Sequence, residues 1–438
     1  MDTEAVELDW SDINTLKEHW SELDSASRRE RFFALSRPDA EELFLTLGPD
    51  DQIDLIGELS PIQKRSWMRL LALDDAADLI QRLDSERKQE FLLLLDEQSR
   101  QEVMGLLAYA EDDAGGLMNP RYLRLRPEMS VEEAIRYLRA QARTPIKIIY
   151  YAYVIDYDLK VVGVVSFREL LLAAPEKRVR EIMITEMITV PEEMDREEVS
   201  RTFSKHNLMA IPVVDPEGHM KGIVTYDDIV EVVQQEATED IQKLGGMEAL
   251  DAPYFKIGFL EMLRKRAGWL VILFVGEMFT TIVMSRYEDA IHRMTVLSIF
   301  IPLIISSGGN SGSQASTLII RALALREIRL RDWHKVFLRE LSSGVSLGLI
   351  LGFIGLVRVL LWGHFHPDLA VDYKLLGLTV SMAVLGVVTW GTMAGSMLPF
   401  ILRRAGLDPA SASAPFVATI VDVTGLLIYF TVATMTLL

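Results

Sequence analysis

An acidic residue interrupts the last of several long apolar stretches in this chain of 438 residues. Asp422 stands in "PFVATIVDVTGLLIYFTVA", about 16 Å beyond Ser411 if the stretch is helical. A carboxylate that deep in a membrane costs at least about 2.5 kcal/mol and usually marks an ion or proton pathway. Helical steps of three and four from Asp422 reach a small and weakly polar stripe, which comprises Ser411, Pro415, Ala418, Thr419, Gly425 and Tyr429. We interpret Asp422 as a cation-binding residue; the alternative is a salt bridge within the bundle, for which Arg358 is the only centrally placed cation candidate.

The stretch "SSGGNSGSQAST" at 306–317 also lies inside an apolar run. In a soluble protein its Gly, Ser and Asn content would indicate a loop. Irregular backbone at membrane depth is tolerated where it lines a wet cavity. We therefore predict a glycine-rich break in this span, which forms the second wall of a pore, with Asn310 facing the ion and the serines supporting the backbone.

Glu277, in "FVGEMFTT", is a second acidic residue within an apolar stretch. A glutamate can reach a neighbouring hydroxyl or take up a proton, so its role stays open between pathway and structure.

Five stretches are long and apolar enough to cross a membrane. They lie near 268–285, 295–320, 338–362, 374–402 and 411–437. Lys and Arg gather before the first stretch, between the second and third, and between the fourth and fifth; these residues are Lys256, Arg264, Lys265, Arg266, Arg321, Arg326, Arg329, Arg331, Lys335, Arg339, Arg403 and Arg404. The positive-inside rule then predicts a cytoplasmic N-terminus and an extracytoplasmic C-terminus. Glycines four residues apart, at 344, 348 and 352 and at 391 and 395, predict close helix packing.

Charge is divided unevenly along the chain. Residues 1–250 hold 29 basic and 51 acidic side chains, whereas the remainder holds 16 and 12. An acidic excess of that size repels nucleic acid and anionic lipid and attracts cations. Cysteine is absent, which excludes disulfides and thiolate chemistry. We find no metal-type His pair and no phosphate loop, so we expect no enzyme, and the N-terminal "MDTEAVELDW" is not expected to be a signal peptide.

The first 118 residues read as short amphipathic helices. The units "LSP", "LDS" and "LDE" recur, each an apolar helix end followed by a Ser or Asp suited to cap the next helix. Repeated short helices predict a stack that wraps around itself.

An internal repeat follows this helical region. The sequence "VIDYDLKVVGVVSFREL" aligns with "VVDPEGHMKGIVTYDDI" at a constant offset of 59 residues. Each copy predicts strand, turn, strand and a Ser or Thr cap that opens a helix, and an earlier helix in each copy is capped by Ser130 or Asp195. The tandem unit resembles a pair of CBS domains, which are regulatory modules that often bind adenine nucleotides.

An acidic segment, "TYDDIVEVVQQEATEDIQKLGG", joins the repeat to the apolar half. On a helix, Glu236, Glu239 and Asp240 share one face, and Asp228 and Glu231 form a second cluster. Like charges at these spacings destabilise a helix unless something neutralises them. We therefore expect a divalent cation to be shared between these faces.

The whole chain resembles the MgtE family of magnesium transport channels, through "SSGGNSGSQAST", "DPASASAPFVATIVDVTGLLIYF" and "EATEDIQKLGG". The resemblance implies a multidomain membrane protein with an N-terminal α-helical superhelix, a tandem α/β CBS pair, a connecting (plug) helix and a five-span α-helical transmembrane domain. The corresponding boundaries are 1–118, 119–185, 186–235, 236–265 and 266–438.

The same resemblance implies roles for particular residues. A homodimer would place a pore on its two-fold axis, where Asp422, the backbone at Ala418 and Asn310 receive hydrated Mg²⁺. Cytoplasmic Mg²⁺ would close the pore by binding acidic residues that map to Asp195, Glu197, Asp227, Asp228, Glu231, Glu236, Glu239, Asp240 and Asp112. ATP at the CBS pair would involve Tyr151, Arg168 and Glu169. Ala414 stands where some members of the family place a polar side chain.

The expected function is thus Mg²⁺ uptake across a bacterial plasma (inner) membrane, with membrane lipid around a multi-pass homodimer. Carboxylate and carbonyl ligands would also admit Mn²⁺, Co²⁺ or Ni²⁺. Two alternatives are a membrane-anchored CBS sensor of nucleotide or metal that does not conduct ions, and a proton- or sodium-coupled carrier. A sensor needs no carboxylate at mid-membrane.

Overall fold

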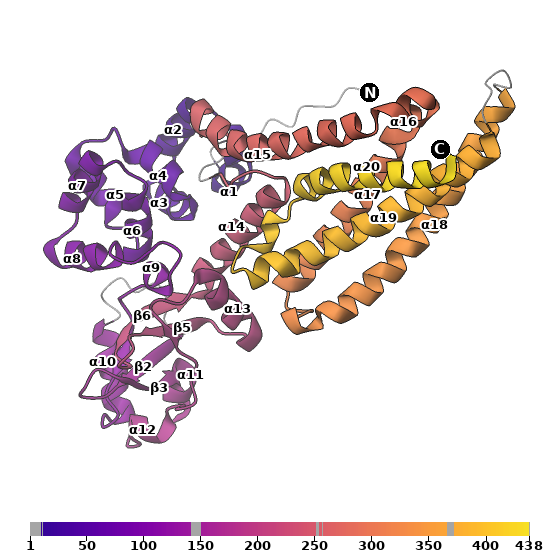
Figure 1. Ribbon diagram of the computed structural model, residues 1–438. Helices are drawn as coiled ribbons and strands as arrows, with labels where there is room; N and C mark the ends of the chain where they lie inside the picture. Colours follow the sequence, from indigo (N-terminus) through magenta and orange to yellow (C-terminus); the bar gives the residue numbers. More distant parts are fainter. Residues whose placement is uncertain are drawn as a thin grey trace, which may run out of the picture. The chain divides into compact units, whose positions relative to one another are not determined.

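The computed structural model describes residues 10, 12–141, 150–250, 254–255, 257–365 and 372–437. The chain divides into two compact units, Met1–Gln234 and Gln235–Leu438, which are described separately below (Figure 1). Lys256, one of the basic residues that indicate the membrane orientation, lies outside the described residues.

The first unit begins with a series of short helices, as the repeated caps predict. Ser60, Asp84 and Asp96 each cap a helix: the Asp84 carboxylate accepts the backbone N–H groups of Glu86 and Arg87 at 3.1 and 3.0 Å. The elements are α1 (Ile13–His19), η1 (Trp20–Glu22), α2 (Ser25–Ala34), α3 (Arg37–Thr46), α4 (Pro49–Ile56), α5 (Pro61–Met68), α6 (Leu73–Gln81), α7 (Ser85–Leu94), α8 (Glu97–Leu106) and α9 (Ala114–Leu117).

Two copies of a three-stranded α/β unit follow, and the sequence offset of 59 residues is reproduced in the second and third strands of each copy. In the first copy β1 (Arg124–Leu125) runs parallel to β2 (Tyr151–Ile155), which is antiparallel to β3 (Val161–Ser166). The second copy repeats this order with β4 (Val190–Pro191), β5 (Ala210–Val214) and β6 (Met220–Thr225). Their helices are α10 (Val131–Gln141), α11 (Phe167–Leu172), α12 (Val179–Ile182) and α13 (Arg196–His206).

The helix after the second copy is much longer than its counterpart. Whereas α11 has 6 residues, α14 (Tyr226–Leu244) has 19, so it begins in the first unit and ends in the second. The acidic segment singled out in the sequence is therefore a continuation of the last helix of the repeat. It ends at Leu244, before the next long helix starts at Phe259.

Within its described residues, the second unit contains five helices long and apolar enough to cross a membrane, which confirms the predicted number. The elements that make up this unit after α14 are α15 (Phe259–Arg286), α16 (Glu288–Arg293), α17 (Val296–Ala324), η2 (Leu330–Asp332), α18 (Trp333–Phe365), α19 (Tyr373–Arg404), η3 (Pro409–Ser411) and α20 (Ala414–Leu437) (Figure 1).

The predicted break in the second span is wrong, because α17 is one continuous helix of 29 residues through "SSGGNSGSQAST". Its glycines serve packing instead. A methyl group at Gly391 or Gly395 of α19 would collide with the carbonyl oxygen of Gly308 or Gly312, so the two backbones are in direct contact. Helices without bulky side chains at a crossing can approach this closely in lipid.

The glycines of α18 have the predicted role as well. At Gly348 an added methyl group would stand 2.8 Å from the Leu385 side chain, and at Gly352 it would stand 2.9 Å from the carbonyl oxygen of Ser381. Helix α19 is therefore packed between α17 and α18 along glycine-lined contacts, and its valines at 384, 387 and 388 are buried in the core of the membrane domain.

Candidate metal sites

Asp422 lies half-buried on α20, at the crossing of that helix with α17. The contact between the two helices is close at Gly309, where an added Cβ would stand 3.6 Å from the Cβ of Ala418, one turn before Asp422. The structure thus brings Ala418 together with the residue that precedes Asn310. The side chain of Asn310 is exposed, and its amide donates to Ser306 Oγ at 3.5 Å.

The serines of α17 attach this helix to its neighbours. Ser316 Oγ donates to the carbonyl oxygen of Ala412 at 2.7 Å, and Ser313 Oγ donates to that of Ala414 at 3.2 Å. Ser311 Oγ lies 2.6 Å from Thr392 Oγ1 on α19. The sequence suggested that these serines support an interrupted backbone. Because the helix is continuous, their hydroxyls instead attach α17 to the start of α20 and to α19.

Glu277 on α15 is a neighbour of Asp422 on α20, and its charge acts on the Asp422 carboxyl group. The two helices cross closely one residue earlier, where a Cβ at Gly276 would stand 2.8 Å from Thr419 Cγ2. No ion pair joins Asp422 to Arg358 among the residues described, and Arg358 is exposed. The arrangement therefore favours a carboxylate pair over the salt bridge that was the sequence-based alternative.

A second acidic site lies in the first unit. Carboxylate oxygens of Asp74 and Asp75 on α6 and of Asp228 on α14 lie within 4.8 Å of one another. Asp78 lies one turn further along α6. Part of this residue is exposed to solvent, and protein atoms surround the rest. Desolvation, and then the charges of Asp75 and Glu231, raise its pKa to about 7.

Sequence reasoning found Asp228 and Glu231 but missed Asp74, Asp75 and Asp78. The available signal was "LDDAADLI", an amphipathic helix with three acids in its first two turns. Acids in the first turn of a helix are common because they favour the helix dipole, so this signal alone did not distinguish a ligand from an ordinary helix start. Only the fold brings α6 against the start of α14.

Several other predicted regulatory residues already have protein partners. Asp112 Oδ1 lies 3.1 Å from Arg196 Nη1, and Glu197 forms an ion pair with Arg201. The carboxylate of Asp195 caps α13 through the backbone N–H groups of Glu197 and Glu198. The hydroxyl of Thr225 donates to Asp227 and, at 2.6 Å, to Asp228.

The acids near the end of α14 belong to the second unit. Glu236, Glu239 and Asp240 are half-buried there. Glu239 pairs with Lys243 one turn later, at 2.6 Å. Lys243 thus neutralises part of the acidic face at which the sequence predicted a divalent cation.

The residues expected at a nucleotide site lie together in the first repeat. Tyr151 is paired in register with Ser166 across β2 and β3, and Ser166 caps α11, which carries Arg168 and Glu169. The Glu169 carboxylate is engaged in the cap, since Ser166 N donates to it at 2.9 Å. The guanidinium of Arg168 is exposed.

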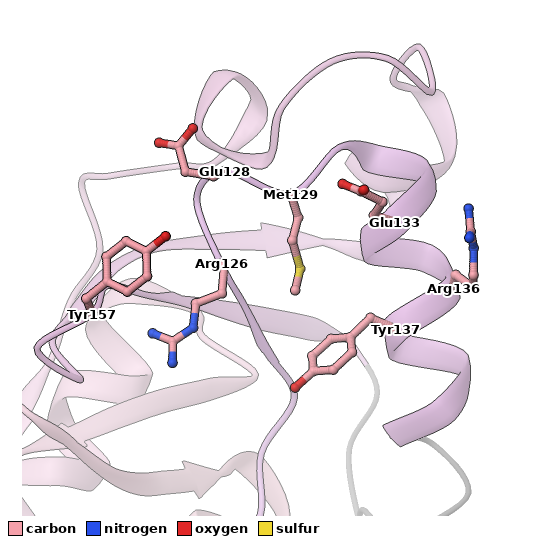
Figure 2. Close-up of a pocket in the computed structure, with 7 residues that line it drawn as sticks. All are labelled: Arg126, Glu128, Met129, Glu133, Arg136, Tyr137 and Tyr157. Carbon is pink, nitrogen blue, oxygen red and sulfur yellow. The ribbon is translucent and has the colours of Figure 1, made fainter.

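A cavity of about 530 Å³ opens elsewhere in the same repeat, and none of these three residues lines it (Figure 2). Arg126 lies at its floor, where its guanidinium donates to the carbonyl oxygen of Ile155 at 3.2 Å and is 5.7 Å from the ring of Tyr157. The complete lining is Arg126, Glu128, Met129, Glu133, Arg136, Tyr137 and Tyr157.

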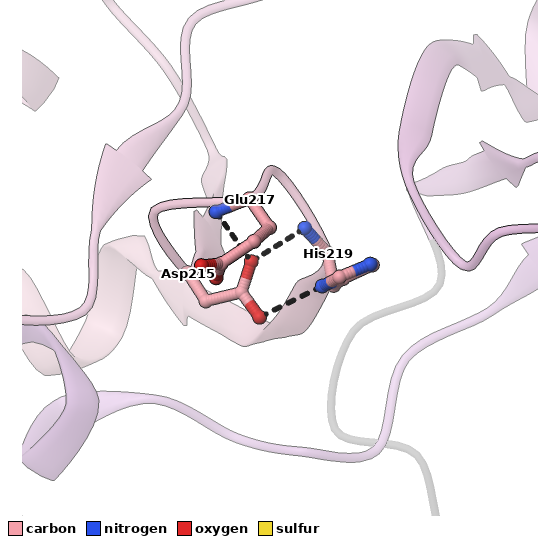
Figure 3. A group of neighbouring side chains, drawn as sticks. All are labelled: Asp215, Glu217 and His219. Carbon is pink, nitrogen blue, oxygen red and sulfur yellow. Dashed lines mark hydrogen bonds and ion pairs between the residues drawn. The ribbon is translucent and has the colours of Figure 1, made fainter.

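A third group of possible ligands, Asp215, Glu217 and His219, forms the turn between β5 and β6 (Figure 3). One Asp215 oxygen accepts the backbone N–H groups of Glu217 and His219, and the other lies 2.9 Å from His219 Nδ1 and 3.2 Å from Lys221 Nζ. Burial opposes ionisation of Asp215, but these donors outweigh it and hold its pKa well below the usual range. The group is accounted for as a turn.

A membrane domain with a carboxylate pair between its helices, joined to acidic regulatory-type modules, defines the class of multi-pass membrane transport proteins that carry their regulatory domains in the same chain. Comparison with known protein families narrows this class. The MgtE divalent cation transporter domain matches residues 301–432, the MgtE intracellular N domain matches 11–112, and the CBS domain matches 114–176 and 179–235.

Similar proteins agree with these matches. The magnesium transporter MgtE of Thermus thermophilus is 41% identical over 417 residues, 94% of this chain and 90% of that protein. The magnesium transporter MgtE of Enterococcus faecalis is 33% identical over 334 residues, 76% and 71% of the two chains. A crystal structure of the cytosolic domain of the Mg²⁺ channel MgtE in complex with ATP is 38% identical, covers 50% of this chain and 90% of that one, and has a TM-score of 0.47. The chain belongs to the MgtE family of divalent cation transporters, and it is not an enzyme.

Proposed function

We propose that this protein is a Mg²⁺-selective channel that mediates magnesium uptake and is closed by cytoplasmic Mg²⁺. The observation that carries the proposal is the carboxylate of Asp422, which lies on a membrane-spanning helix beside Glu277 and one turn from the contact between Ala418 and α17. Ionisable groups at such depth are expensive to keep and are retained where they serve an ion pathway.

The donor set suits hydrated Mg²⁺. This ion gives up its waters reluctantly and is usually held by one or two carboxylates together with water. In a homodimer each chain would contribute one Asp422, with the backbone at Ala418 and the amide of Asn310 touching the hydration shell. The exposure of Asn310 in a single chain supports this role. Oxygen ligands also accept Mn²⁺, Co²⁺ and Ni²⁺, so selectivity would come from ion size and hydration.

Closure by cytoplasmic Mg²⁺ would act through the acidic groups of the soluble part. The convergence of Asp74, Asp75 and Asp228 supports such a site, because three carboxylates within 4.8 Å of one another create a negative local potential that attracts a divalent cation. Glu231 and Asp227 stand near Asp228 on the same helix, and Glu236, Glu239 and Asp240 continue it toward the membrane domain. Asp112, Asp195 and Glu197 are weaker candidates, since each already accepts from protein groups.

The orientation and a nucleotide effect are parts of the same proposal. The basic residues that follow α17 and α19 support an orientation with the soluble domains in the cytoplasm of a bacterial cell and the C-terminus outside. ATP would bind at Tyr151, Arg168 and Glu169; the pairing of Tyr151 with Ser166, the cap of the helix that carries Arg168 and Glu169, supports this site.

Flux of Mg²⁺ into proteoliposomes tests the proposal. The parent chain should take up Mg²⁺, and Asp422→Ala should lower the rate by about tenfold or more, a ratio that corresponds to about 1.4 kcal/mol. The control is Asp289→Asn, which removes an exposed acid of the short helix α16 and should leave flux unchanged.

Three results would contradict the proposal. Absence of flux in the parent would favour a non-conducting sensor, and equal flux in parent and Asp422→Ala would remove the ion-binding role. Flux that needs a proton or Na⁺ gradient would indicate a coupled carrier instead of a channel.

A further inference from the structure

One lysine lies between two carboxylates from separate parts of the membrane unit. Lys243 stands in the last turn of α14, and its Nζ is 2.6 Å from Glu239 Oε1 and 2.7 Å from Asp408 Oδ2. Glu239 belongs to the same helix, whereas Asp408 belongs to the connection between α19 and α20. The side chains are 29%, 29% and 39% exposed for Lys243, Glu239 and Asp408, so water screens these ion pairs only in part.

Asp408 is itself held in place. Its second oxygen accepts the backbone N–H of Ala410 at 2.9 Å and caps η3. Both carboxylate oxygens are therefore used, one by the turn and one by Lys243. The Lys243 ammonium therefore binds a carboxylate whose position is fixed by the backbone. A displacement of Lys243 would act on the Asp408 turn through this ion pair.

The segment that follows Asp408 is fastened to α17. Ala410 and Ala412 are buried, and Ser316 Oγ of α17 donates to the carbonyl oxygen of Ala412 at 2.7 Å. Helix α20, which carries Asp422, starts two residues later. A movement of Asp408 would therefore act at the base of α20 and at its attachment to α17.

The end of α14 also makes apolar contacts with this base. Leu244 packs against Ala410, Ala412 and Ile320. Gly246 has φ +73°, and an added Cβ there would stand 2.9 Å from Trp269 and 3.2 Å from Pro415. A positive φ and this close approach both require glycine. The residues at the end of α14 and just after it therefore contact the start of α20. Leu244 and Gly246 make the apolar contacts, and Lys243 makes the ion pair.

We propose that Lys243 is a positioning residue that couples α14 to the base of α20 through Asp408. This inference rests on the proposed function, because it concerns how the state of the cytoplasmic helix reaches the ion pathway. Glu239 orients the lysine and Asp408 receives it. Without the ammonium, two carboxylates would face each other, and their repulsion would separate the helix from the loop.

The role predicts loss of coupling with retention of conduction. In proteoliposomes, Mg²⁺ added on the side of the soluble domains should inhibit flux of the parent. Lys243→Met should keep its flux at low Mg²⁺. The Mg²⁺ concentration that inhibits it should rise about fivefold or more, which is the lower end of typical coupling between sites. Lys243→Arg should retain inhibition, since it preserves the charge. Lys335→Met is the matched control, because that lysine is 73% exposed and pairs with Asp332 at 3.4 Å.

A charge exchange separates coupling from a general loss of structure. The double variant Lys243→Glu with Asp408→Lys restores an opposite pair and should recover inhibition that Lys243→Glu alone loses. If Lys243→Met does not fold, Asp408→Asn carries the same test, since an asparagine still caps η3 but no longer attracts an ammonium.

The outcomes distinguish this inference from the function on which it rests. A parent that conducts no Mg²⁺, or that Mg²⁺ does not inhibit, would overturn the proposed function and the coupling role together. A parent that is inhibited, beside Lys243→Met and Asp408→Asn variants that are inhibited equally, would overturn only the role of Lys243.

Discussion

Replacing Asp75 by asparagine tests whether the acidic cluster of the first unit is a cation site. The carboxylate oxygens of Asp74, Asp75 and Asp228 lie within 4.8 Å of one another. At that separation two unit charges repel by about 0.9 kcal/mol in water and by about 3.5 kcal/mol at an effective dielectric constant of 20. Asp75→Asn removes two of the three repulsive pairs. Because Asp75 and Asp228 are only half-buried, we expect a net gain in stability of about 1 to 2 kcal/mol without divalent ions.

Thermal unfolding of the full chain in detergent measures this gain. In the presence of a chelator the soluble part of Asp75→Asn should unfold about 2 to 8 °C above the parent, at about 2 to 4 °C for each kcal/mol in a domain of this size. Mg²⁺ should narrow or remove this difference in stability between the variant and the parent. At ten times its dissociation constant it stabilises the parent by about 1.4 kcal/mol, whereas the variant, which has lost a ligand, should respond much less.

The control for this experiment is Asp158→Asn, which removes an exposed acid of the turn between β2 and β3. It should change neither the midpoint in chelator nor the response to Mg²⁺. An Asp75→Asn protein that is less stable than the parent in chelator, or that keeps the full Mg²⁺ response, would refute the reasoning that these three carboxylates form a shared cation site.

Two further predictions concern stability. Asp78 has its pKa raised from 3.8 to about 7, so the folded state holds a proton that the unfolded state releases; this carboxyl therefore opposes folding increasingly as the pH rises from about 4 to 7. Asp78→Asn should stabilise the protein by about 1 kcal/mol at pH 8, after allowance for solvent screening, and by progressively less toward pH 4, as measured by urea unfolding at each pH. Gly395→Ala should destabilise the membrane domain by about 1 to 3 kcal/mol in thermal unfolding, because its methyl group would collide with the carbonyl oxygen of Gly312. Gly355→Ala, where the nearest atom is 3.6 Å away, should be neutral.

The tandem repeat could be predicted from the sequence almost residue by residue. An offset of 59 maps β2 onto β5 and β3 onto β6 with identical ends. The predictable features are local ones: alternation of apolar residues in a strand, and a hydroxyl or carboxylate that caps the next helix. The helix caps of the N-terminal region were predictable for the same reason.

The break predicted in the second span shows where such local reasoning fails. Glycine, serine and asparagine disfavour an isolated helix in water, and "SSGGNSGSQAST" was interpreted on that basis. In α17 the same glycines allow contact with the backbone of α19, and Ser313 and Ser316 bond to carbonyl groups near the start of α20. Tertiary packing therefore overrides the local preference.

Contacts between distant segments were equally inaccessible. Asp422 was found from its depth in an apolar stretch, but its neighbour Glu277 is 145 positions earlier in the chain, and nothing in either stretch pairs them. The meeting of Asp75 with Asp228 has the same origin. A sequence shows which charged groups are costly to bury, but only the fold shows which of these groups lie next to one another.

The unequal length of two equivalent helices has a mechanical consequence. Duplication produced two copies of one module, yet only the second has an extended last helix, α14, with 19 residues against 6 in α11. A helix of that length is about 28 Å long, so a tilt of about 5° at its first turn would move its far end by about 2.5 Å. The extended α14 can therefore act as a lever arm, whereas α11 is too short to do so.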